Sequence, residues 1–269
     1  MISRIKISLA LGLGVALLSG LSGTASATGI IPAGWTCNGA CGSDGADGVV
    51  PLSPLGTSQY QFVTTTGGIS GVGVLPTGAV GGETNGSTLA TTVFSAKAGD
   101  ALNFFFDYTT SDGSGFADYA WAELFTGGGT PSALLFTART EASGSIVPGL
   151  GLPAPAATLS PASVPIMAGL TTWSPLGTWS GQCFLGVGQG CGTTGWVNSN
   201  FVIPVAGNYF LEVGVVNALD EEFDSGLAMD GVTVAGVPIN PPTPEPASLL
   251  LMGTGLLSLC GIVRRKFQA

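Results

Sequence analysis

The sequence predicts an all-β protein built as a single β-sandwich of jelly-roll type. Of its 269 residues, 44 are Gly and 17 are Pro, and strand-like runs recur between these turn residues. The middle of the chain has no run of Leu, Glu, Lys and Ala that would favour a long amphipathic helix. An apolar content of 45% can bury one substantial core and argues against disorder. A β-helix is the other fold considered, but no repeat of fixed period supports it.

The strand signals are spaced by turns, and about nine or ten strands are expected. The run NYFLEVGVV at 208–216 is long and apolar enough to be central in a sheet. The predicted strands cover residues 59–64, 69–75, 88–95, 101–108, 119–125, 133–139, 197–203, 209–216 and 227–234.

Two of these runs give the clearest local detail. The segments 101–108 and 119–125 are separated by TTSDGSGFAD, a loop signal. Within 119–125, strict alternation places Tyr119 and Trp121 on one face and the small Ala residues on the other, and we expect Trp121 in the core. A Pro- and Gly-rich insertion at 143–169 is expected to form a long surface loop.

The first 27 residues are expected to be removed. MISRIKISLALGLGVALLSGLSGTASA has a basic start, an uncharged apolar stretch and small residues at Ala25 and Ala27, the pattern of a secretory signal peptide cleaved after Ala27. The alternative is an uncleaved anchor helix, but the apolar part is short for a membrane span.

The other end of the chain has three ordered parts. Pro244, Glu245 and Pro246 precede an uncharged, mostly apolar run at 247–263, just long enough to cross a bilayer core. Three basic residues then follow and hold that end in the cytoplasm: Arg264, Arg265 and Lys266. This order resembles the PEP-CTERM sorting signal of Gram-negative bacteria, which an exosortase-type membrane protease processes. The alternative is an ordinary C-terminal anchor.

The resemblance implies a location. Such proteins are exported, held briefly in the inner membrane by the C-terminal helix, cut near the Pro-Glu-Pro and associated with the cell surface, exopolysaccharide or biofilm matrix. FDYTTSDGSGFADYAWAELF and DSGLAMDGVTVAG also resemble parts of β-sandwich domains common among these proteins, over about 35–237. The expected divisions are a signal peptide at 1–27, a sandwich at 28–237, a Pro-rich linker at 238–246 and a sorting helix with its basic tail at 247–269.

The body between the two targeting segments is strongly acidic. Its two basic residues, Lys97 and Arg139, stand against fifteen acidic residues, a formal charge of −13 over 28–243. Nucleic acid is therefore not an expected partner, since its binding needs clustered Lys and Arg. Signal peptidase, the exosortase-type protease and exopolysaccharide are the expected partners.

Four cysteines remain in the body, and an even number in an exported chain suggests disulfides. We predict two short-range pairs, Cys37–Cys41 and Cys183–Cys191, among three possible connectivities. Zinc is the alternative, but the spacings fit it poorly and the sequence has no His.

The acidic residues form two groups that predict calcium as a structural cofactor. Calcium takes about six to eight oxygens, and carboxylates with carbonyls from Gly-rich turns supply them. Neither group has EF-hand spacing, and solvated acidic loops are the alternative reading. The candidate ligands are Asp107, Asp112 and Asp118 in the first group and Asp220, Glu222, Asp224 and Asp230 in the second.

Catalysis is not expected. Without His, a Ser-His-Asp or Cys-His arrangement is excluded in its usual form. Paired carboxylates are the remaining option, and a glycosidase could use Asp107 with Glu123, or Glu212 with Asp230.

Three tryptophans flank the second cysteine pair and predict a glycan-stacking surface, with core positions as the alternative: Trp173, Trp179 and Trp196. The expected function is a non-enzymatic protein of the cell surface or extracellular matrix that binds exopolysaccharide. A self-associating structural protein is the first alternative, and a carboxylate glycosidase is the second.

The signal peptide gives a direct prediction. Sequencing the N-terminus of the exported protein should give Thr28 as the first residue, because a signal peptidase reads the small residues before it. An N-terminus at Met1 would contradict this prediction.

Overall fold

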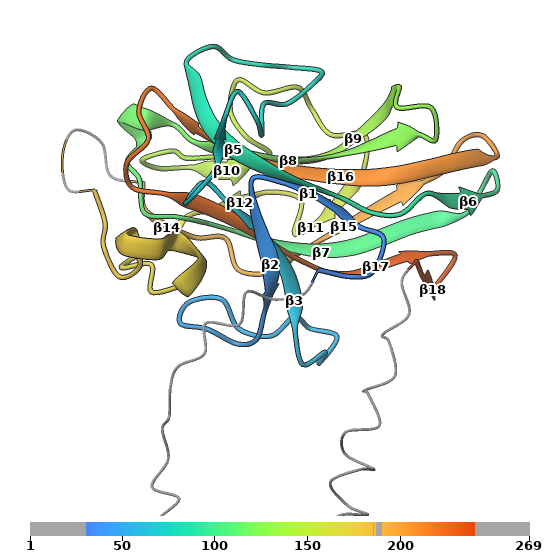
Figure 1. The fold of residues 1–269 in the computed structure, drawn as a ribbon, viewed down its shortest axis with the longest axis horizontal. Helices are drawn as coiled ribbons and strands as arrows, with labels where there is room; N and C mark the ends of the chain where they lie inside the picture. Colours follow the sequence, from blue (N-terminus) through green and yellow to red (C-terminus); the bar gives the residue numbers. More distant parts are fainter. Residues whose placement is uncertain (1–30, 185, 187–189, 240–269) are drawn as a thin grey trace, which may run out of the picture.

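The computed structural model describes residues 31–184, 186 and 190–239, and in it the chain forms two β-sheets packed face to face (Figure 1). The path through the first sheet is β1-β5-β16-β8-β9, and the path through the second is β11-β15-β7-β17-β3-β2. The long strands pair antiparallel throughout. The prediction of an all-β sandwich is confirmed, and β16 is central in its sheet as expected.

The first sheet combines strands from across the chain: β1 (Thr36–Asn38), β4 (Ile69–Ser70), β5 (Glu83–Ala90), β6 (Phe94–Ala96), β8 (Tyr119–Thr126), β9 (Pro131–Arg139) and β16 (Gly207–Ala218). The second sheet contains β2 (Ala40–Asp44), β3 (Tyr60–Thr64), β7 (Ala101–Thr110), β11 (Thr158–Ser160), β13 (Met167–Ala168), β14 (Gly192–Thr193), β15 (Val197–Val202), β17 (Ser225–Val234) and β18 (Val237–Pro238). A separate two-stranded sheet pairs β10 (Ser145–Val147) with β12 (Val164–Pro165), and two 3-10 helices, η1 (Ser114–Phe116) and η2 (Ser174–Trp179), lie in loops.

The main core lies between the two sheets and is rich in aromatic rings. Phe104 and Phe106 of β7 point inward and meet Phe136 of β9, which belongs to the other sheet. The rings of Phe106 and Phe136 stack with centroids 3.8 Å apart and planes 7° from parallel. Because all three side chains are fully buried, this contact joins the two layers through apolar area removed from water.

The outer face of the first sheet carries its own apolar cluster. Trp121 lies there, almost completely buried. The prediction that it is a core residue is confirmed, although its cluster lies on the outer face of the sheet and not between the two sheets. Its indole Nε1 donates a 2.6 Å hydrogen bond to the Gly73 carbonyl, in the segment 71–82 that covers this face. We call this group the first outer cluster: Leu75, Tyr119, Trp121, Phe125, Leu134 and Val216.

The second sheet is covered on its outer face as well. Residues 45–58 and η2 lie over it and supply part of a second outer cluster: Val50, Tyr60, Trp173, Leu176 and Ala228. Each sheet is thus buried on both faces over much of its area, which explains why β8 is buried at almost every position despite its alternating sequence.

Several strand boundaries differ from the predicted ones. The expected strand 69–75 ends at Ser70, because the chain then leaves the ladder to cover the first outer cluster. The expected strand 88–95 is two strands, β5 and β6, which both pair with β16. Residues 91–93 stand opposite only Phe210 and Leu211, so the ladder is interrupted there.

The middle of the chain also differs. The insertion at 143–169 is not a plain loop, because it contributes β10, β11, β12 and β13, and β11 extends the edge of the second sheet. The neighbouring strands β7 and β8 lie in opposite sheets, so the loop between them crosses from one layer to the other.

Both targeting segments lie outside the described residues, including the predicted signal peptide and the predicted sorting helix at 247–263. Over the part of the chain that the structure covers, no helix is long and apolar enough to cross a membrane.

The packing of Trp121 predicts an intolerance at Gly214. These two residues are cross-strand partners, and a Cβ at Gly214 would come within 2.5 Å of the indole ring. Gly214→Ala should therefore lower the free energy of unfolding by about 1–3 kcal/mol, as overpacking does. Urea unfolding measures this change.

Gly128→Ala is the control for that substitution, because a Cβ there meets only the Thr126 hydroxyl at 3.9 Å. Equal stability of the Gly214→Ala protein and the wild type would contradict the rigid packing of Trp121.

Candidate functional site

Two acidic loops meet at one end of the sandwich. The end of β7 pairs with the start of β17, Thr110 opposite Ser225. This register sets the β7–β8 loop beside the β16–β17 loop, although they are far apart in sequence. The Ser111 amide and hydroxyl both donate to the Asp224 carbonyl, at 3.1 and 2.7 Å. The predicted ligands Asp112, Asp118, Asp220 and Asp224 are therefore brought to the same end.

Asp118 is a structural carboxylate at this junction. It is completely buried, and its oxygens accept from the Ala218 amide at 2.8 Å and the Ser225 hydroxyl at 2.7 Å. Burial, followed by the nearby charge of Asp112, raises the pKa of Asp118 well above its ordinary value. These contacts tie the end of β16 to the start of β17.

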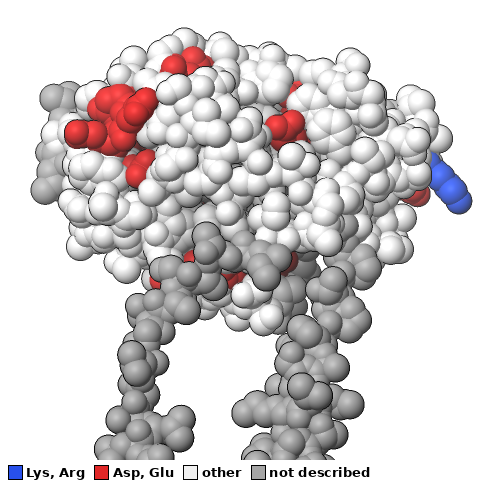
Figure 2. All heavy atoms as spheres, in the orientation of Figure 1, with Lys and Arg blue, Asp and Glu red and all other residues white. Residues whose placement is uncertain are grey.

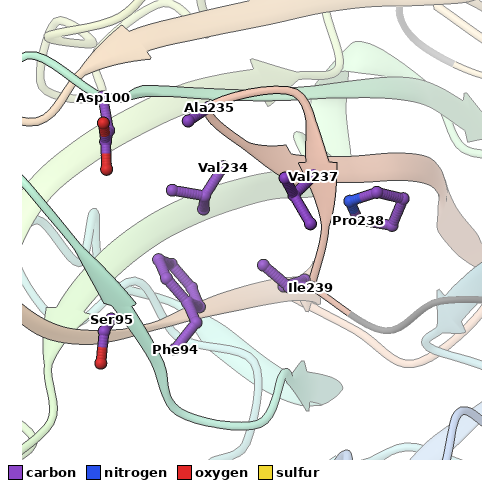
Figure 3. Close-up of a pocket in the computed structure, with 8 residues that line it drawn as sticks. All are labelled: Phe94, Ser95, Asp100, Val234, Ala235, Val237, Pro238 and Ile239. Atoms are coloured by element: carbon purple, nitrogen blue, oxygen red, sulfur yellow. The ribbon is translucent and has the colours of Figure 1, made fainter.

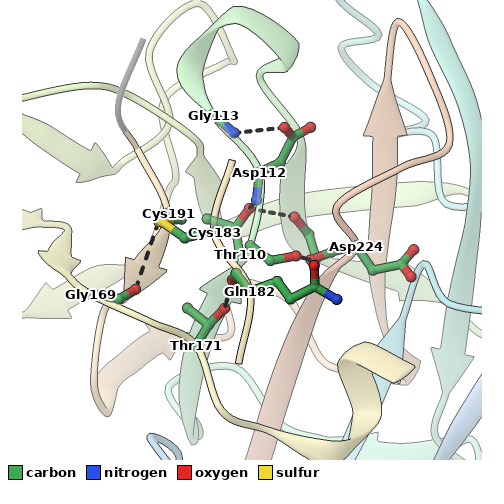
Figure 4. Close-up of a disulfide and its surroundings, with 11 residues drawn as sticks. Thr110, Asp112, Gly113, Gly169, Thr171, Gln182, Cys183, Cys191 and Asp224 are labelled. Carbon is green, nitrogen blue, oxygen red and sulfur yellow. Dashed lines mark hydrogen bonds between the residues drawn. A yellow bond between two sulfur atoms is a disulfide. The ribbon is translucent and has the colours of Figure 1, made fainter. Parts of the chain in front are cut away.

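Asp224 is also held by hydroxyl groups. Its carboxylate accepts from the Thr65 hydroxyl at 2.7 Å and from the Thr66 hydroxyl. In Figure 4 this carboxylate points away from that of Asp112. Asp224 therefore joins the β16–β17 loop to the segment after β3 rather than facing the other acids.

Asp112 differs from its neighbours because one of its oxygens has no partner. Only 2% of the residue is exposed. Oδ1 accepts from the Gly113 amide at 2.6 Å, as Figure 4 shows, while the buried Oδ2 makes no hydrogen bond. Burial raises the pKa of Asp112 to about 8, and the charges of Asp220 and Asp224 add to the increase.

The other predicted calcium ligands divide between the β16–β17 loop and the outer face of the second sheet. Asp220 and Glu222 are in the same loop, and the Glu222 amide donates to Asp220 Oδ1 at 3.0 Å. Asp230 lies on the outer face of the second sheet and accepts from Ser53, Thr57 and the Gly231 amide. Within residues 31–184, 186 and 190–239, no three Asp, Glu or Cys side chains are grouped closely enough for a ready metal site.

Asp107 is likewise separate from the loop acids. It points outward from β7 and is completely buried. Oδ1 accepts from the Thr193 and Thr194 hydroxyls at 2.6 and 3.2 Å, and Oδ2 makes no hydrogen bond. Burial raises the pKa of Asp107 to about 7 against the lowering effect of these hydroxyls.

Neither predicted glycosidase pair lies across a common cleft. Inward residues alternate with Asp107 on β7 and with Asp230 on β17, so both acids lie on the outer face of the second sheet. By the same alternation, Glu123 and Glu212 lie on the outer face of the first sheet. Each pair is therefore separated by the whole sandwich.

Glu123 and Glu212 instead form a pair that sequence reasoning missed. They are direct cross-strand partners on β8 and β16. Glu123 Oε1 accepts from the Thr77 hydroxyl at 2.9 Å, and its buried Oε2 makes no hydrogen bond. Burial and then the charge of Glu212 raise the pKa of Glu123, and burial raises that of Glu212. Only the strand register could have revealed this pair.

The three predicted glycan-stacking tryptophans have different positions. Trp173 is completely buried in the second outer cluster and donates to the Tyr60 hydroxyl at 2.9 Å. Trp196 packs edge-on against Tyr60 and donates to the Pro51 carbonyl. Trp179 is half-buried and stacks on Phe223, with ring centroids 4.2 Å apart. Of the three, Trp179 is placed with other aromatic rings at the acidic end.

Trp179 is one member of a row of four half-buried rings. Phe184 meets Phe223 edge-on at 5.3 Å, and Phe116 meets Phe184 edge-on at 5.4 Å. The members come from three loops, and we call the group the aromatic row: Trp179, Phe223, Phe184 and Phe116. Single phenylalanines inside Gly-rich loops were the only sequence signal for the last three.

The two predicted disulfides are confirmed. Cys37 pairs with Cys41, and Cys183 pairs with Cys191, with Cα atoms 6.0 and 5.7 Å apart. The second bridge is drawn in Figure 4, close to the β7–β8 loop. Next to it, the Phe184 amide donates to the Ser111 carbonyl at 2.9 Å. The bridge thus fixes the segment that carries Phe184 beside the acidic loops.

A separate hollow of about 300 Å³ lies at the opposite end of β17 (Figure 3). Phe94, Val234, Val237 and Ile239 form its apolar walls, and Asp100 lies at its edge. Ile239 is the last described residue, so the chain continues from this hollow toward the C-terminus.

The surface is poor in charge except at the acidic end. On the face shown in Figure 2, acidic side chains gather most densely where the β16–β17 loop turns in Figure 1, and most of the remaining surface is uncharged. A surface of this kind offers few ionic contacts away from the acidic loops.

Comparison with known proteins identifies the C-terminal segment. Residues 242–266 match the PEP-CTERM protein-sorting motif, which marks this chain as an exported protein. No curated protein matches the chain in sequence. Among solved structures, it is similar to the K1 cleaved adhesin domain of Lys-gingipain from Porphyromonas gingivalis W83, with 12% identity over 76% of this chain and 91% of that one, at a TM-score of 0.30.

Buried Asp107 predicts a pH dependence of stability. Burial raises the pKa of Asp107 from its ordinary value of 3.8 to about 7 in the folded protein. Its contribution is therefore full below pH 4 and is lost as the pH rises through 7, on the order of 4 kcal/mol. Asp107→Asn should reduce the fall in the free energy of unfolding between pH 4 and pH 8, measured by urea titrations.

Asp100→Asn is the control for losing an acidic side chain, because Asp100 lies in the turn before β7 and accepts from the Lys97 amide. Parallel pH profiles for Asp107→Asn and the wild type would show that another group carries the dependence.

Proposed function

We propose that this exported, PEP-CTERM-sorted protein is a non-enzymatic component of the cell surface or extracellular matrix of a Gram-negative bacterium, where it binds exopolysaccharide through the aromatic row. An exosortase-type protease cuts the chain near Pro244–Pro246 after signal peptidase has removed residues 1–27. The apolar segment at 247–263 anchors the protein in the inner membrane only until that cut.

The aromatic row carries the proposal. Its rings are half-buried, so each keeps part of its surface open to solvent while neighbouring rings hold its orientation. Flat apolar faces with polar groups beside them suit the stacking of sugar rings. Backbone hydrogen bonds and the Cys183–Cys191 bridge hold part of the row in place, which lowers the entropic cost of binding.

The charge of the body supports a particular class of glycan. A formal charge of −13 over 28–243 repels polyanions at low ionic strength. Neutral polysaccharide, or acidic polysaccharide accompanied by divalent cations, therefore fits this surface better than nucleic acid does.

The alternatives have less support. The carboxylate pairs considered for a glycosidase lie on opposite outer faces, and Glu123 of the cross-strand pair is only 1% exposed beneath Thr77. A glycosidase needs both carboxyl groups against the same sugar bond. Self-association is the other alternative, and it predicts oligomers without glycan affinity.

Removing the indole at the end of the aromatic row tests the proposal. Trp179→Ala should weaken binding to the exopolysaccharide of the producing organism about tenfold, because one stacking contact is lost. Affinity electrophoresis of the full chain in gels containing the polysaccharide measures the change, and thermal melting checks that the variant is folded.

Trp196→Ala is the matched control, because Trp196 is also half-buried but lies outside the aromatic row. Equal retention of the Trp179→Ala protein and the wild type would contradict the proposed surface. Concentration-dependent oligomers in analytical ultracentrifugation, without retention, would favour the self-associating alternative.

A further inference from the structure

The unpartnered oxygen of Asp112 needs an explanation. A buried polar atom without a hydrogen bond is costly, and a buried charge without a partner is more so. Asp118 and Asp224, its acidic neighbours, each have a donor for both oxygens. Asp112 alone in this group brings a free, buried carboxylate oxygen to the junction of the two loops.

No basic side chain of the body compensates these acids. Lys97 lies before β7, and the acidic β7–β8 loop lies after it. The ten-residue strand therefore separates Lys97 from this loop by about 30 Å. The Arg139 guanidinium donates to the carbonyl groups of Ala117 and Leu150. Lys97 and Arg139 are the only basic residues between 28 and 243, so no further basic side chain of the body could pair with Asp112 Oδ2.

Asp220 is the acid best placed to share such a charge. It lies in the β16–β17 loop, and its charge acts on both Asp112 and Asp118. Asp220 is half-buried and its Oδ1 accepts only the local Glu222 amide among the contacts of the described chain. Its carboxylate therefore has capacity for a further ligand.

We propose that a divalent cation of the calcium class binds between the β7–β8 and β16–β17 loops, with Asp112 Oδ2 as its buried ligand and Asp220 as its ligand from the second loop. Calcium accepts carboxylates, backbone carbonyls and water in flexible sets of six to eight. Two carboxylates with carbonyls and water satisfy that requirement, so a third grouped acid is not needed.

The cation would also position part of the aromatic row. Phe223 lies three residues after Asp220 and has a φ of 54°. Leu219, which directly precedes Asp220, has a φ of 74°. These left-handed conformations are unfavourable for side chains with a Cβ and persist where surrounding contacts fix them. A cation bound to Asp220 would fix this loop and hold the Phe223 ring against Trp179. This consequence, glycan binding that requires the cation, rests on the proposed function.

Direct binding tests the site without reference to glycan. Equilibrium dialysis of the full chain against calcium chloride should give one bound calcium per chain, and excess calcium should raise the melting temperature by about 5 °C relative to chelator. Asp112→Asn should lose both effects while keeping the size of the side chain. No bound calcium in the wild type, or an equal amount bound by Asp112→Asn, would overturn the proposal.

Two further variants keep the result interpretable. Glu221→Gln removes an exposed acid from the same loop and should bind calcium as the wild type does. If Asp112→Asn does not fold in chelator, Asp220→Asn replaces it, because its side chain makes only the local contact with Glu222. Wild-type calcium affinity in Asp220→Asn would then overturn the proposal.

Retention on exopolysaccharide with and without chelator is measured separately. Calcium binding without glycan retention would contradict the proposed function and would still support the cation site. Glycan retention that chelator does not change would contradict the dependence of glycan binding on the cation.

Discussion

The pairing of β7 with β17 is the interaction on which the rest of the molecule depends. The inward face of β7 places Phe104 and Phe106 against Phe136 of the other sheet, which joins the two layers. Its outward face buries Asp107, and its last residues align with the start of β17. That register alone puts the β7–β8 and β16–β17 loops together, and with them the acids and two members of the aromatic row.

Burial on both faces of each sheet sets the chemistry of the interior. The two outer clusters exclude water from acids that a solvated sheet face would leave exposed, so Asp107 and Glu123 are surrounded by hydroxyl groups and apolar side chains. Hydroxyl groups of threonine and serine, rather than basic side chains, donate hydrogen bonds to these buried carboxylates. This fits a body with only two basic residues between 28 and 243. At the junction of the two loops, Asp112 is the acid whose Oδ2 has no such donor.

The two ends of the sandwich differ in what they carry: the chain exit lies at one end, and the acidic loops lie at the other. The chain leaves the described body at Ile239, beside the hollow at the far end of β17, and the sorting motif follows at 242–266. The acidic loops and the aromatic row lie about 30 Å away, at the other end of the same ten-residue strand. The aromatic row and the point where the chain leaves the described body therefore lie at opposite ends of the sandwich.

The sequence by itself determined the all-β class, most of the long strands, both disulfide pairs and the sorting motif, because each depends on period-two alternation, turn residues or short spacings within one segment. Tertiary structure decided which strands share a sheet. It separated Asp107 from Glu123 by the whole sandwich, set Glu123 opposite Glu212, and brought Asp112 beside a loop about a hundred residues further along the chain. These residue pairings follow from long-range strand register and from the packing of the covering segments. Local sequence patterns carry no information about either.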